Sequence, residues 1–174
     1  MKAARRLFAE RGYEGTRTAD IAREAGIATG TLFNYAPTKR HVVLLLWTTR
    51  VRGILAAGLA AADEAEEPTE IVRAIFDPIF KFYAEDPELG RVFVQTVAFD
   101  NEGVDLKEFN EGFIAALSAR LAPHAPTTAP VAATNVFAAY YLVLSLVLNH
   151  TITDPDAATA ALLHLVAAQR QGWV

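Results

Sequence analysis

The segment TADIAREAGIATGTLFNYAPTK, residues 18–39, predicts two short helices joined by a tight turn. The first helix is expected to start at Thr18, whose hydroxyl is a candidate N-cap, and to end near Ala25. Gly26 follows directly, and glycine adopts the left-handed dihedrals that often close a helix at the least steric cost. The first helix therefore has both a start signal and a stop signal.

A second short helix is expected from Thr29 to Tyr35, with Leu32 pointing inward and polar side chains available for its outer face. Ile27 is expected to fill the angle between the two helices, and Pro37 prevents the second helix from continuing. Two short helices around a small-residue turn, the second with a polar outer face, form the helix-turn-helix pattern of DNA-binding proteins.

The outer face of this pattern supplies the candidate DNA contacts. In protein–DNA complexes, phosphate contacts hold the protein in register on the duplex, and contacts to base edges read the sequence. Gly30 is expected to let the backbone of the second helix approach the duplex closely. The phosphate contacts are assigned to Thr18, Thr31, Tyr35 and Lys39, and the base contacts to Thr29 and Asn34.

The charge distribution agrees with a nucleic-acid-binding N-terminal part. The chain of 174 residues carries a net charge of −4. Residues 1–52 hold ten basic and four acidic side chains, a net charge of +6, so the remaining chain carries −10. Because a basic module attracts the phosphate backbone and an acidic one is repelled by it, this asymmetry favours a DNA-binding head on a body that binds other partners.

The segment from Ala3 to Val43 resembles the N-terminal DNA-binding domain of the TetR (tetracycline-repressor-like) family of bacterial regulators. The shared residues are Leu7-Phe8, Gly12-Tyr13, Thr18, Ile21-Ala22, Ala25-Gly26-Ile27, Gly30-Thr31-Leu32-Phe33, Tyr35 and Lys39. The resemblance implies a three-helix helix-turn-helix DNA-binding domain, followed by a helical ligand-binding and dimerisation domain that diverges among members. We place the first domain at residues 1–47 and the second at residues 48–174.

The remaining chain predicts helices throughout, and no strand pattern interrupts them. Apolar residues recur at helical spacing, and Pro68, Asp86-Pro87 and Asp154-Pro155 supply start signals. The expected helices span residues 2–11, 38–62, 68–85, 88–99, 106–122 and 130–153, with a last one from residue 154 and a turn at 100–105. The helix 38–62 continues from the DNA-binding domain into the body. The predicted fold class is all-α.

Residues 130–153 contain no Asp, Glu, Lys or Arg and are long enough to cross a membrane. Polar residues such as Asn135 and Asn149, together with acidic flanks, argue against a membrane helix and favour a buried interface. Two apolar C-terminal helices without a further partner in the chain predict a homodimer. We expect it to form through residues 130–153 and the last helix, with Leu144 and Leu162 in the interface.

The sequence shows no constellation for catalysis or metal binding. The chain has no cysteine, which excludes disulfides and thiolate chemistry. The histidines lack ligand spacing, and no phosphate-binding glycine loop or nucleophile elbow is found. The charged residues directly after Met1 do not resemble a signal peptide. We therefore expect a cytoplasmic protein that is not an enzyme and that uses no metal or cofactor.

The aromatic residues of the central helices allow two interpretations, a plain hydrophobic core or the wall of a ligand cavity. The resemblance implies such a cavity in this part of the chain. The predicted ligand-binding residues are Phe76, Phe80, Tyr83, Phe93, Thr96, Phe113, Leu117, Phe137 and Tyr140, with Gln95, Asn135 and His150 as further polar anchors. Because the body has few basic residues, we expect a small, largely apolar effector that is uncharged or cationic.

The sequence thus predicts a DNA-binding transcriptional regulator, a repressor that a small ligand releases from a palindromic double-stranded DNA operator. The alternative is a helical ligand-binding or enzymatic protein that has lost DNA binding. Two departures from the TetR pattern favour this alternative. Phe33 lacks the hydroxyl of the tyrosine that is frequent at this position, and Ala36 stands where phenylalanine is common.

Overall fold

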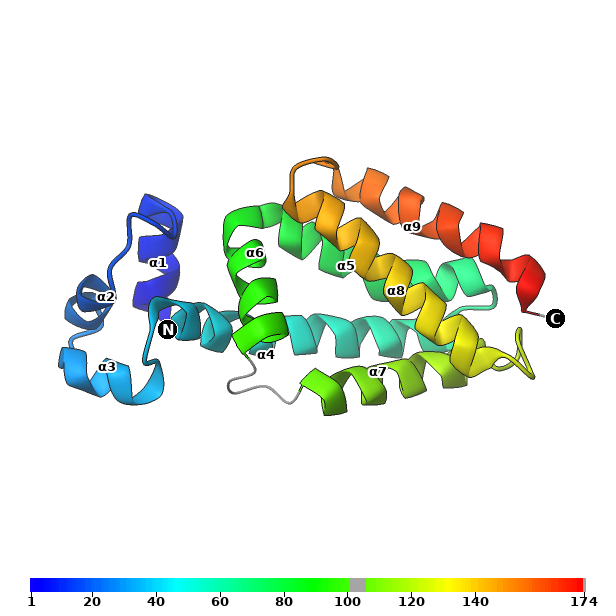
Figure 1. The fold of residues 1–174 in the computed structure, drawn as a ribbon, viewed down its shortest axis with the longest axis horizontal. Coiled ribbons are helices and arrows are strands. Elements are labelled where there is room, and N and C mark those ends of the chain that lie inside the picture. Colours follow the sequence, from blue (N-terminus) through cyan, green and yellow to red (C-terminus); the bar gives the residue numbers. More distant parts are fainter. Residues whose placement is uncertain (101–105, 174) are drawn as a thin grey trace. The chain divides into compact units, whose positions relative to one another are not determined.

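The computed structural model describes residues 1–100 and 106–173, apart from the side chains of Phe99, Asp100, Leu106 and Gln171. Every regular element in these two ranges is helical, which confirms the all-α fold class (Figure 1). The chain forms two compact units. The first comprises Met1–Arg50 and Glu88–Val104, and the second comprises Val51–Pro87 and Asp105–Val174. The domain division at residue 47 stays a prediction.

The first unit contains the predicted helix-turn-helix. It begins with α1 (Lys2–Arg11), α2 (Thr18–Glu24) and α3 (Thr29–Tyr35), which match the expected helices to within one residue. Helix α4 (Lys39–Ala61) starts in this unit and continues into the second. Helix α6 (Pro87–Gln95) is followed by a π-helical segment, Thr96–Asp100, where the sequence predicted one helix over 88–99. The predicted turn at 100–105 lies outside the described residues from position 101 onward.

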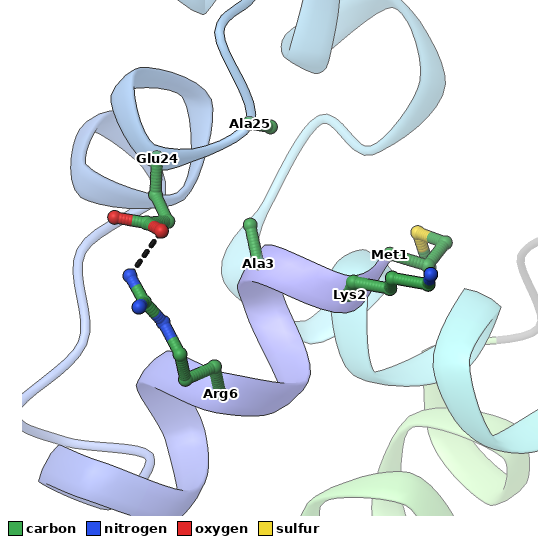
Figure 2. Close-up of a pocket in the computed structure, with 6 residues that line it drawn as sticks. All are labelled: Met1, Lys2, Ala3, Arg6, Glu24 and Ala25. Atoms are coloured by element: carbon green, nitrogen blue, oxygen red, sulfur yellow. Dashed lines mark ion pairs between the residues drawn. The ribbon is translucent and has the colours of Figure 1, made fainter.

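An ion pair joins α1 to α2. The guanidinium of Arg6 pairs with the carboxylate of Glu24 across a shallow, open hollow of about 490 Å³ (Figure 2). The hollow is lined by Met1, Lys2, Ala3, Arg6, Glu24 and Ala25. Since this lining has no aromatic residue and is open to solvent, the hollow does not have the character of the apolar ligand site that the sequence predicts.

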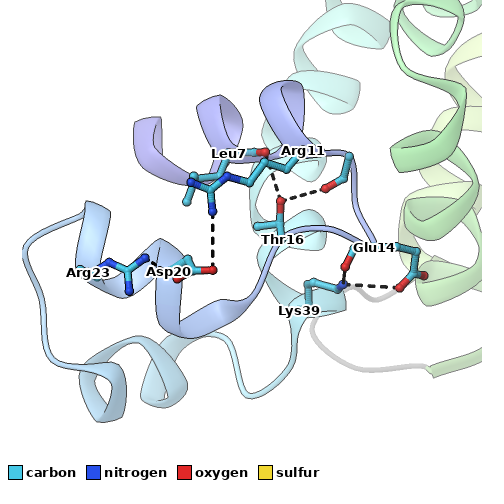
Figure 3. Close-up of polar contacts among 8 residues, drawn as sticks. Leu7, Arg11, Glu14, Thr16, Asp20, Arg23 and Lys39 are labelled. Carbon is cyan, nitrogen blue, oxygen red and sulfur yellow. Dashed lines mark hydrogen bonds and ion pairs between the residues drawn. The ribbon is translucent and has the colours of Figure 1, made fainter.

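The end of α1 is closed by its own loop. Gly12 adopts a left-handed φ of 68°, and its N–H donates to the carbonyl of Phe8. The buried hydroxyl of Thr16 donates to the carbonyl of Leu7 at 3.1 Å and lies 2.8 Å from that of Gly12 (Figure 3). The bond from the Gly12 N–H satisfies one of the last four carbonyls of α1, which the helix itself leaves without a partner, and the Thr16 hydroxyl ties the loop back to the last turns of the helix. The loop between α1 and α2 therefore has a well-defined backbone course.

The second unit is a bundle built around α5. Its helices are α5 (Pro68–Glu85), α7 (Leu106–Leu121), α8 (Ala129–Leu148) and α9 (Pro155–Gln169), together with the second half of α4 and a short 3₁₀ turn, Ala62–Glu64. Helix α5 packs against α8 and α9, and α7 packs against α8 (Figure 1). The largest fully buried side chains of this unit are Phe76, Phe80, Ile71, Ile75, Ile79, Leu117, Leu121, Leu144 and Leu162.

The starts of α5 and α9 follow the signals in the sequence. Glu67 and Glu70 form a reciprocal capping box at the start of α5. The carboxylate of Asp154 accepts the N–H of Asp156 at 3.1 Å and caps α9. These local bonds explain why both predicted starts are confirmed within one residue.

Two expectations for the C-terminal helices are wrong. Leu144 and Leu162 are 1% and 0% exposed within a single chain, so they belong to its core and not to an interface. Helix α8 ends at Leu148, and His150 follows as an exposed residue with a φ of 59°. Helical spacing identified an apolar stripe, but it did not reveal which neighbouring helices cover that stripe.

Helix α8 and the segment Lys39–Glu64 are long and apolar enough to cross a membrane by length and composition. Such segments are also found as core helices in soluble proteins. In α8, 56% of the apolar window is buried, and the helix packs against α5, α7 and α9. Its composition is therefore accounted for by the bundle.

Backbone contact sets the position of α4 on α5. A Cβ placed on Gly58 would lie 2.8 Å from the Cα of Ile75 and 2.9 Å from the carbonyl oxygen of Ala74. On the same helix, a Cβ placed on Gly53 would meet no atom within 4 Å. Packing thus requires glycine at position 58 and not at position 53.

These two glycines give a matched test of the crossing. We expect Gly58→Ala to lower the free energy of unfolding by about 1–3 kcal/mol, because the added methyl group forces two helices apart. Gly53→Ala should raise it by about 0.5–1 kcal/mol, because alanine has the higher helix propensity. Urea unfolding followed by circular dichroism measures both. Equal effects of the two substitutions would contradict the close crossing.

Candidate DNA-binding surface and ligand site

The turn between α2 and α3 has the predicted geometry. Gly26 follows the C-cap residue Ala25 with a φ of 68°, and a Cβ there would meet no atom within 4 Å. Glycine is thus needed for its conformation and not for space. The N–H of Ile27 donates to the carbonyl of Ala22 at 3.0 Å and closes the turn. The Ile27 side chain is 40% exposed, so the expectation that it fills the angle between the helices is wrong.

Helix α3 presents nearly all its side chains to solvent. Of its seven residues, which are all described, Leu32 alone is buried. The exposed ones include every predicted contact on this helix: Thr29, Gly30, Thr31, Asn34 and Tyr35. Tyr35 is 75% exposed, and Phe33 is 43% exposed beside these polar groups. A helix held by one buried residue and otherwise open can place its outer face against a partner.

Thr18 is not the N-cap residue that the sequence predicted. Arg17 is the N-cap residue of α2, and no side-chain bond caps the helix. Thr18 is the first helical residue and is half-buried. The N-cap expectation is therefore wrong, while its phosphate contact stays a prediction.

Lys39 is held by the loop that follows α1. Its Nζ donates to the carbonyl of Tyr13 at 2.7 Å. It also donates to the carbonyl of Glu14 at 3.4 Å (Figure 3). The same ammonium lies 4.1 Å from the centre of the Tyr13 ring and 3.7 Å from the Glu14 carboxylate. An ammonium has three donors, and two of them serve these carbonyls. The Glu14 carboxylate lies beyond hydrogen-bond distance and on an exposed side chain, so an outside acceptor would compete with it for the third donor.

Five of the predicted ligand-binding aromatic residues form one cluster in the second unit. Ring centres are 4.8 Å apart for Phe76 and Tyr140, 5.7 Å for Phe80 and Tyr140, and 5.4 Å for Phe113 and Phe137. Phe113 also meets Phe76 edge-on at 5.9 Å. These separations are typical of favourable aromatic pairs. The cluster is the core of the bundle, and Leu117 is buried one turn beyond Phe113.

Two hydroxyl groups lie inside this apolar cluster. Tyr83 and Tyr140 are buried and hydrogen-bonded to each other. Burial raises the pKa of both phenols well above the ordinary value, because the charged form would lose its hydration. Both therefore stay neutral and provide a donor and an acceptor where the surroundings are otherwise apolar.

Two other predicted ligand-binding residues lie in the first unit. The ring of Phe93 packs 5.8 Å from that of Trp47, and the hydroxyl of Thr96 donates to the carbonyl of Val92 at 2.7 Å. Their part in ligand binding stays a prediction. The further polar anchors Gln95, Asn135 and His150 are all exposed, so none of them supplies a buried polar group for a ligand.

A groove of about 400 Å³ lies between α4 and α7. Its lining residues are Arg52, Leu55, Ala56, Leu59, Glu108, Phe109, Gly112 and Phe113. Phe113 belongs to both the groove and the aromatic cluster, and the guanidinium of Arg52 lies 5.6 Å from the Phe109 ring. Of these residues, only Phe113 is among the ligand-binding residues predicted from the sequence, although the spacing 52, 55, 59 and 109, 112, 113 places each set on one helix face.

No group of three or more His, Asp or Glu side chains that could hold a metal ion is found among the residues the structure describes. The candidate sites are an exposed helix with an oriented lysine, and a mainly apolar groove that shares Phe113 with an aromatic cluster.

The fold is shared with several solved regulators. A transcriptional regulator from Rhodococcus sp. aligns with a TM-score of 0.70 and 20% identity, covering 98% of this chain and 94% of that one. FadR from Thermus thermophilus, a TetR-family repressor in complex with lauroyl-CoA, aligns at 0.68 and 21%, covering 98% and 90%. FadR from Bacillus subtilis, in complex with stearoyl-CoA, aligns at 0.63 and 19%, covering 95% and 94%.

The family is shown by two models. Residues 1–46 match the model of bacterial regulatory proteins of the tetR family, and residues 67–169 match the tetracyclin repressor-like C-terminal domain. No curated protein sequence matches the chain. The two models together span both compact units, so the chain belongs to the tetR family of bacterial regulatory proteins, which are DNA-binding regulators of transcription.

Proposed function

We propose that this protein represses transcription by binding a palindromic operator as a homodimer, and that a small, largely apolar ligand releases it. The observation that carries the proposal is the layout of α3, where only Leu32 is buried and the polar side chains are exposed. The +6 charge of residues 1–52 supports a polyanionic partner for this unit. Such a protein acts in the cytoplasm, where the DNA lies.

Two groups of side chains have different tasks at the operator. Thr18, Thr31, Tyr35 and Lys39 contact phosphates, and Thr29 and Asn34 reach base edges, while Gly30 lets the backbone come near. The exposure of the α3 residues supports these roles.

The first experiment decides between this function and a helical ligand-binding or enzymatic protein without DNA binding. The protein is incubated with a random-sequence duplex pool, and bound duplexes are selected, amplified and sequenced. A regulator yields a palindromic motif and elutes from heparin at a position that depends steeply on salt. A protein that enriches no duplex would fit the alternative, which the apolar Phe33 on the outer face favours.

The two kinds of contact predict different mutant behaviour on the selected duplex. Lys39→Ala should weaken binding to selected and random duplexes alike and flatten the salt slope by about 1. Asn34→Ala should cost about 1–3 kcal/mol on the selected sequence only and change the motif that is enriched. Fluorescence anisotropy over a salt series measures both. If neither variant differs from the unmutated protein, the assignment of these DNA contacts is wrong.

The dimer is proposed to form through the exposed sides of α8 and α9. Helix α8 exposes a stripe of Val131, Asn135, Ala138, Leu142 and Ser145, in which Val131 is 61% and Leu142 is 56% exposed. Helix α9 exposes four alanines, which allow close helix approach, with His164 between them: Ala157, Ala160, Ala167 and Ala168. A self-complementary patch of this kind suits a two-fold interface.

Leu142→Glu should convert the dimer to a monomer, because it buries a charge in the proposed interface. Leu45→Glu is the matched control, since Leu45 is also an exposed leucine, at 46%, but lies on α4. Light scattering at micromolar concentration measures the mass. A dimeric Leu142→Glu protein, or an unmutated monomer, would contradict the interface.

The proposed effector site is the groove together with the aromatic cluster behind it. The lining is mainly apolar, and the basic Arg52 is balanced by the acidic Glu108 in the same lining. This composition supports a largely apolar ligand, uncharged or cationic, for which the Tyr83–Tyr140 hydroxyl pair is the buried polar anchor. The FadR structures hold lauroyl-CoA and stearoyl-CoA, which makes long acyl chains the natural first apolar probes.

Helix α4 is the proposed link between ligand and DNA. It lines the groove with Leu55, Ala56 and Leu59, and its N-terminal half belongs to the unit that carries α3. A dimer must present its recognition helices about one DNA turn, ~34 Å, apart. A ligand that binds better to a form with another α4 position therefore opposes DNA binding by linkage.

One effector should bind the free protein about 5- to 150-fold more tightly than the operator complex, which corresponds to a coupling of about 1–3 kcal/mol. Calorimetry with lauroyl-CoA, lauric acid and an uncharged alkyl probe of equal length measures both affinities and separates the charge classes. Gly112→Leu should block binding, because the new side chain enters open groove space. Equal affinities for free and DNA-bound protein would rule out the release mechanism.

A further inference from the structure

Helix α6 is tied to the helix-turn-helix by one side chain. Glu88, in the first turn of α6, accepts the backbone N–H of Tyr13 through Oε2 at 3.0 Å, although the two residues are 75 positions apart in the chain. A Cβ on Gly12 would lie 3.2 Å from the same oxygen, so the carboxylate fits closely against the loop backbone. The loop after α1 is thus held by a residue that belongs to neither helix of the motif.

Tyr13 is held on its other side by Lys39. The carbonyl of Tyr13 accepts the Lys39 ammonium at 2.7 Å, and the ring lies beneath that ammonium at 4.1 Å. The ring also stacks on Phe8 at 6.0 Å. Tyr13 therefore has its N–H bound by α6, its carbonyl bound by α4 and its ring packed on α1.

These contacts bear on DNA binding because the last of them orients the Lys39 ammonium, a proposed phosphate contact. Lys39 is only 23% exposed, and its ammonium direction depends on where the carbonyls of residues 13 and 14 lie. A phosphate can use the remaining donor only if the ammonium points outward from these carbonyls. Displacing the loop would release Lys39 into many rotamers, and the entropy of ordering it would then oppose phosphate binding.

We propose that Glu88 is a positioning residue for DNA binding, which holds the Tyr13 backbone so that Lys39 is oriented toward a DNA phosphate. This inference rests on the proposed DNA-binding function. It makes α6, besides α4, an element that governs how the first unit meets DNA. A simpler role for Glu88 is that of an acidic residue near the positive end of the α6 dipole.

Three substitutions at position 88 separate the two roles. Glu88→Gln keeps an oxygen that accepts the Tyr13 N–H and loses the charge, so DNA affinity should stay near that of the unmutated protein. Glu88→Asp keeps the charge near the α6 end but withdraws the oxygen by one methylene, and Glu88→Ala removes the acceptor. Both should bind selected and random duplexes several-fold more weakly, with the salt slope flattened by about 1, as for Lys39→Ala.

A double-mutant cycle measures whether the loss of DNA affinity in Glu88→Ala depends on Lys39, which a merely structural role of Glu88 does not predict. If Glu88 acts through Lys39, the variant Glu88→Ala/Lys39→Ala should bind no more weakly than Lys39→Ala alone. The control is Glu111→Ala, since Glu111 is an exposed glutamate on α7 whose ion pair is with Lys107. Thermal unfolding of every variant identifies any loss of affinity that comes from a loss of fold.

The outcomes are distinguishable. Additive losses in the cycle, an unaltered Glu88→Ala protein, or a Glu88→Gln protein as weak as Glu88→Ala would each overturn the positioning role. If the unmutated protein selects no duplex at all, the proposed DNA-binding function fails instead. If it selects a duplex that Glu88→Ala binds equally well, only the role of Glu88 fails.

Discussion

The steric contact between α4 and α5 at Gly58 is the constraint on which the arrangement of the second unit depends. A missing side chain brings two backbones together, and hard-core repulsion then sets the crossing more rigidly than a pair of adaptable side chains could. Arg120 of α7 reinforces it near the C-terminal end of α4. Its guanidinium donates to the carbonyl of Leu59 at 2.9 Å and pairs with Asp63 at 2.8 Å. The groove is bounded by the same turns of α4, so an effector at the proposed site would contact a helix whose position is tightly defined.

Helix α3 of the first unit has a defined position although only one of its side chains is buried. Helix α3 has seven residues, and such a short helix is unstable alone in water. Its position follows from the Gly26 turn, from the buried Leu32 and Ala36, and from the start of α4. The loop after α1 is likewise held in place by bonds to backbone groups. The Thr16 hydroxyl, the Lys39 ammonium and the Glu88 carboxylate all bind main-chain atoms of residues 7–14, and main-chain partners do not change rotamer.

The second unit combines a closed aromatic core with an open groove, and Phe113 belongs to both. Burying two phenol groups costs little here because each hydroxyl has the other as its hydrogen-bond partner. At the proposed effector site, a ligand entering from the groove would have to compete with packed rings and with this mutual bond. Such competition favours ligands with a large apolar surface over small polar ones, since only the former regain the contacts they displace.

Local chemistry in the sequence determined the helix class, the helix-turn-helix and most helix boundaries. Gly26 ends α2 because the turn after the helix requires a residue with a left-handed backbone conformation. Asp154 caps α9 by accepting the N–H of a residue two positions further on. Such signals act within a few residues, so they can be found in the chain alone. Of the proposed DNA contacts, those on α3 could likewise be named from the pattern of one buried and several polar positions.

Tertiary structure decided everything that depends on which elements become neighbours. Periodicity placed Leu144 on an apolar stripe of α8. Only the packing of α8 against α5, α7 and α9 showed that Leu144 is buried within one chain, while Leu142 is exposed. The groove, the Tyr83–Tyr140 pair and the bond from Glu88 to Tyr13 join residues far apart in sequence. Their formation is governed by distances in space, and no local pattern in the chain encodes these distances.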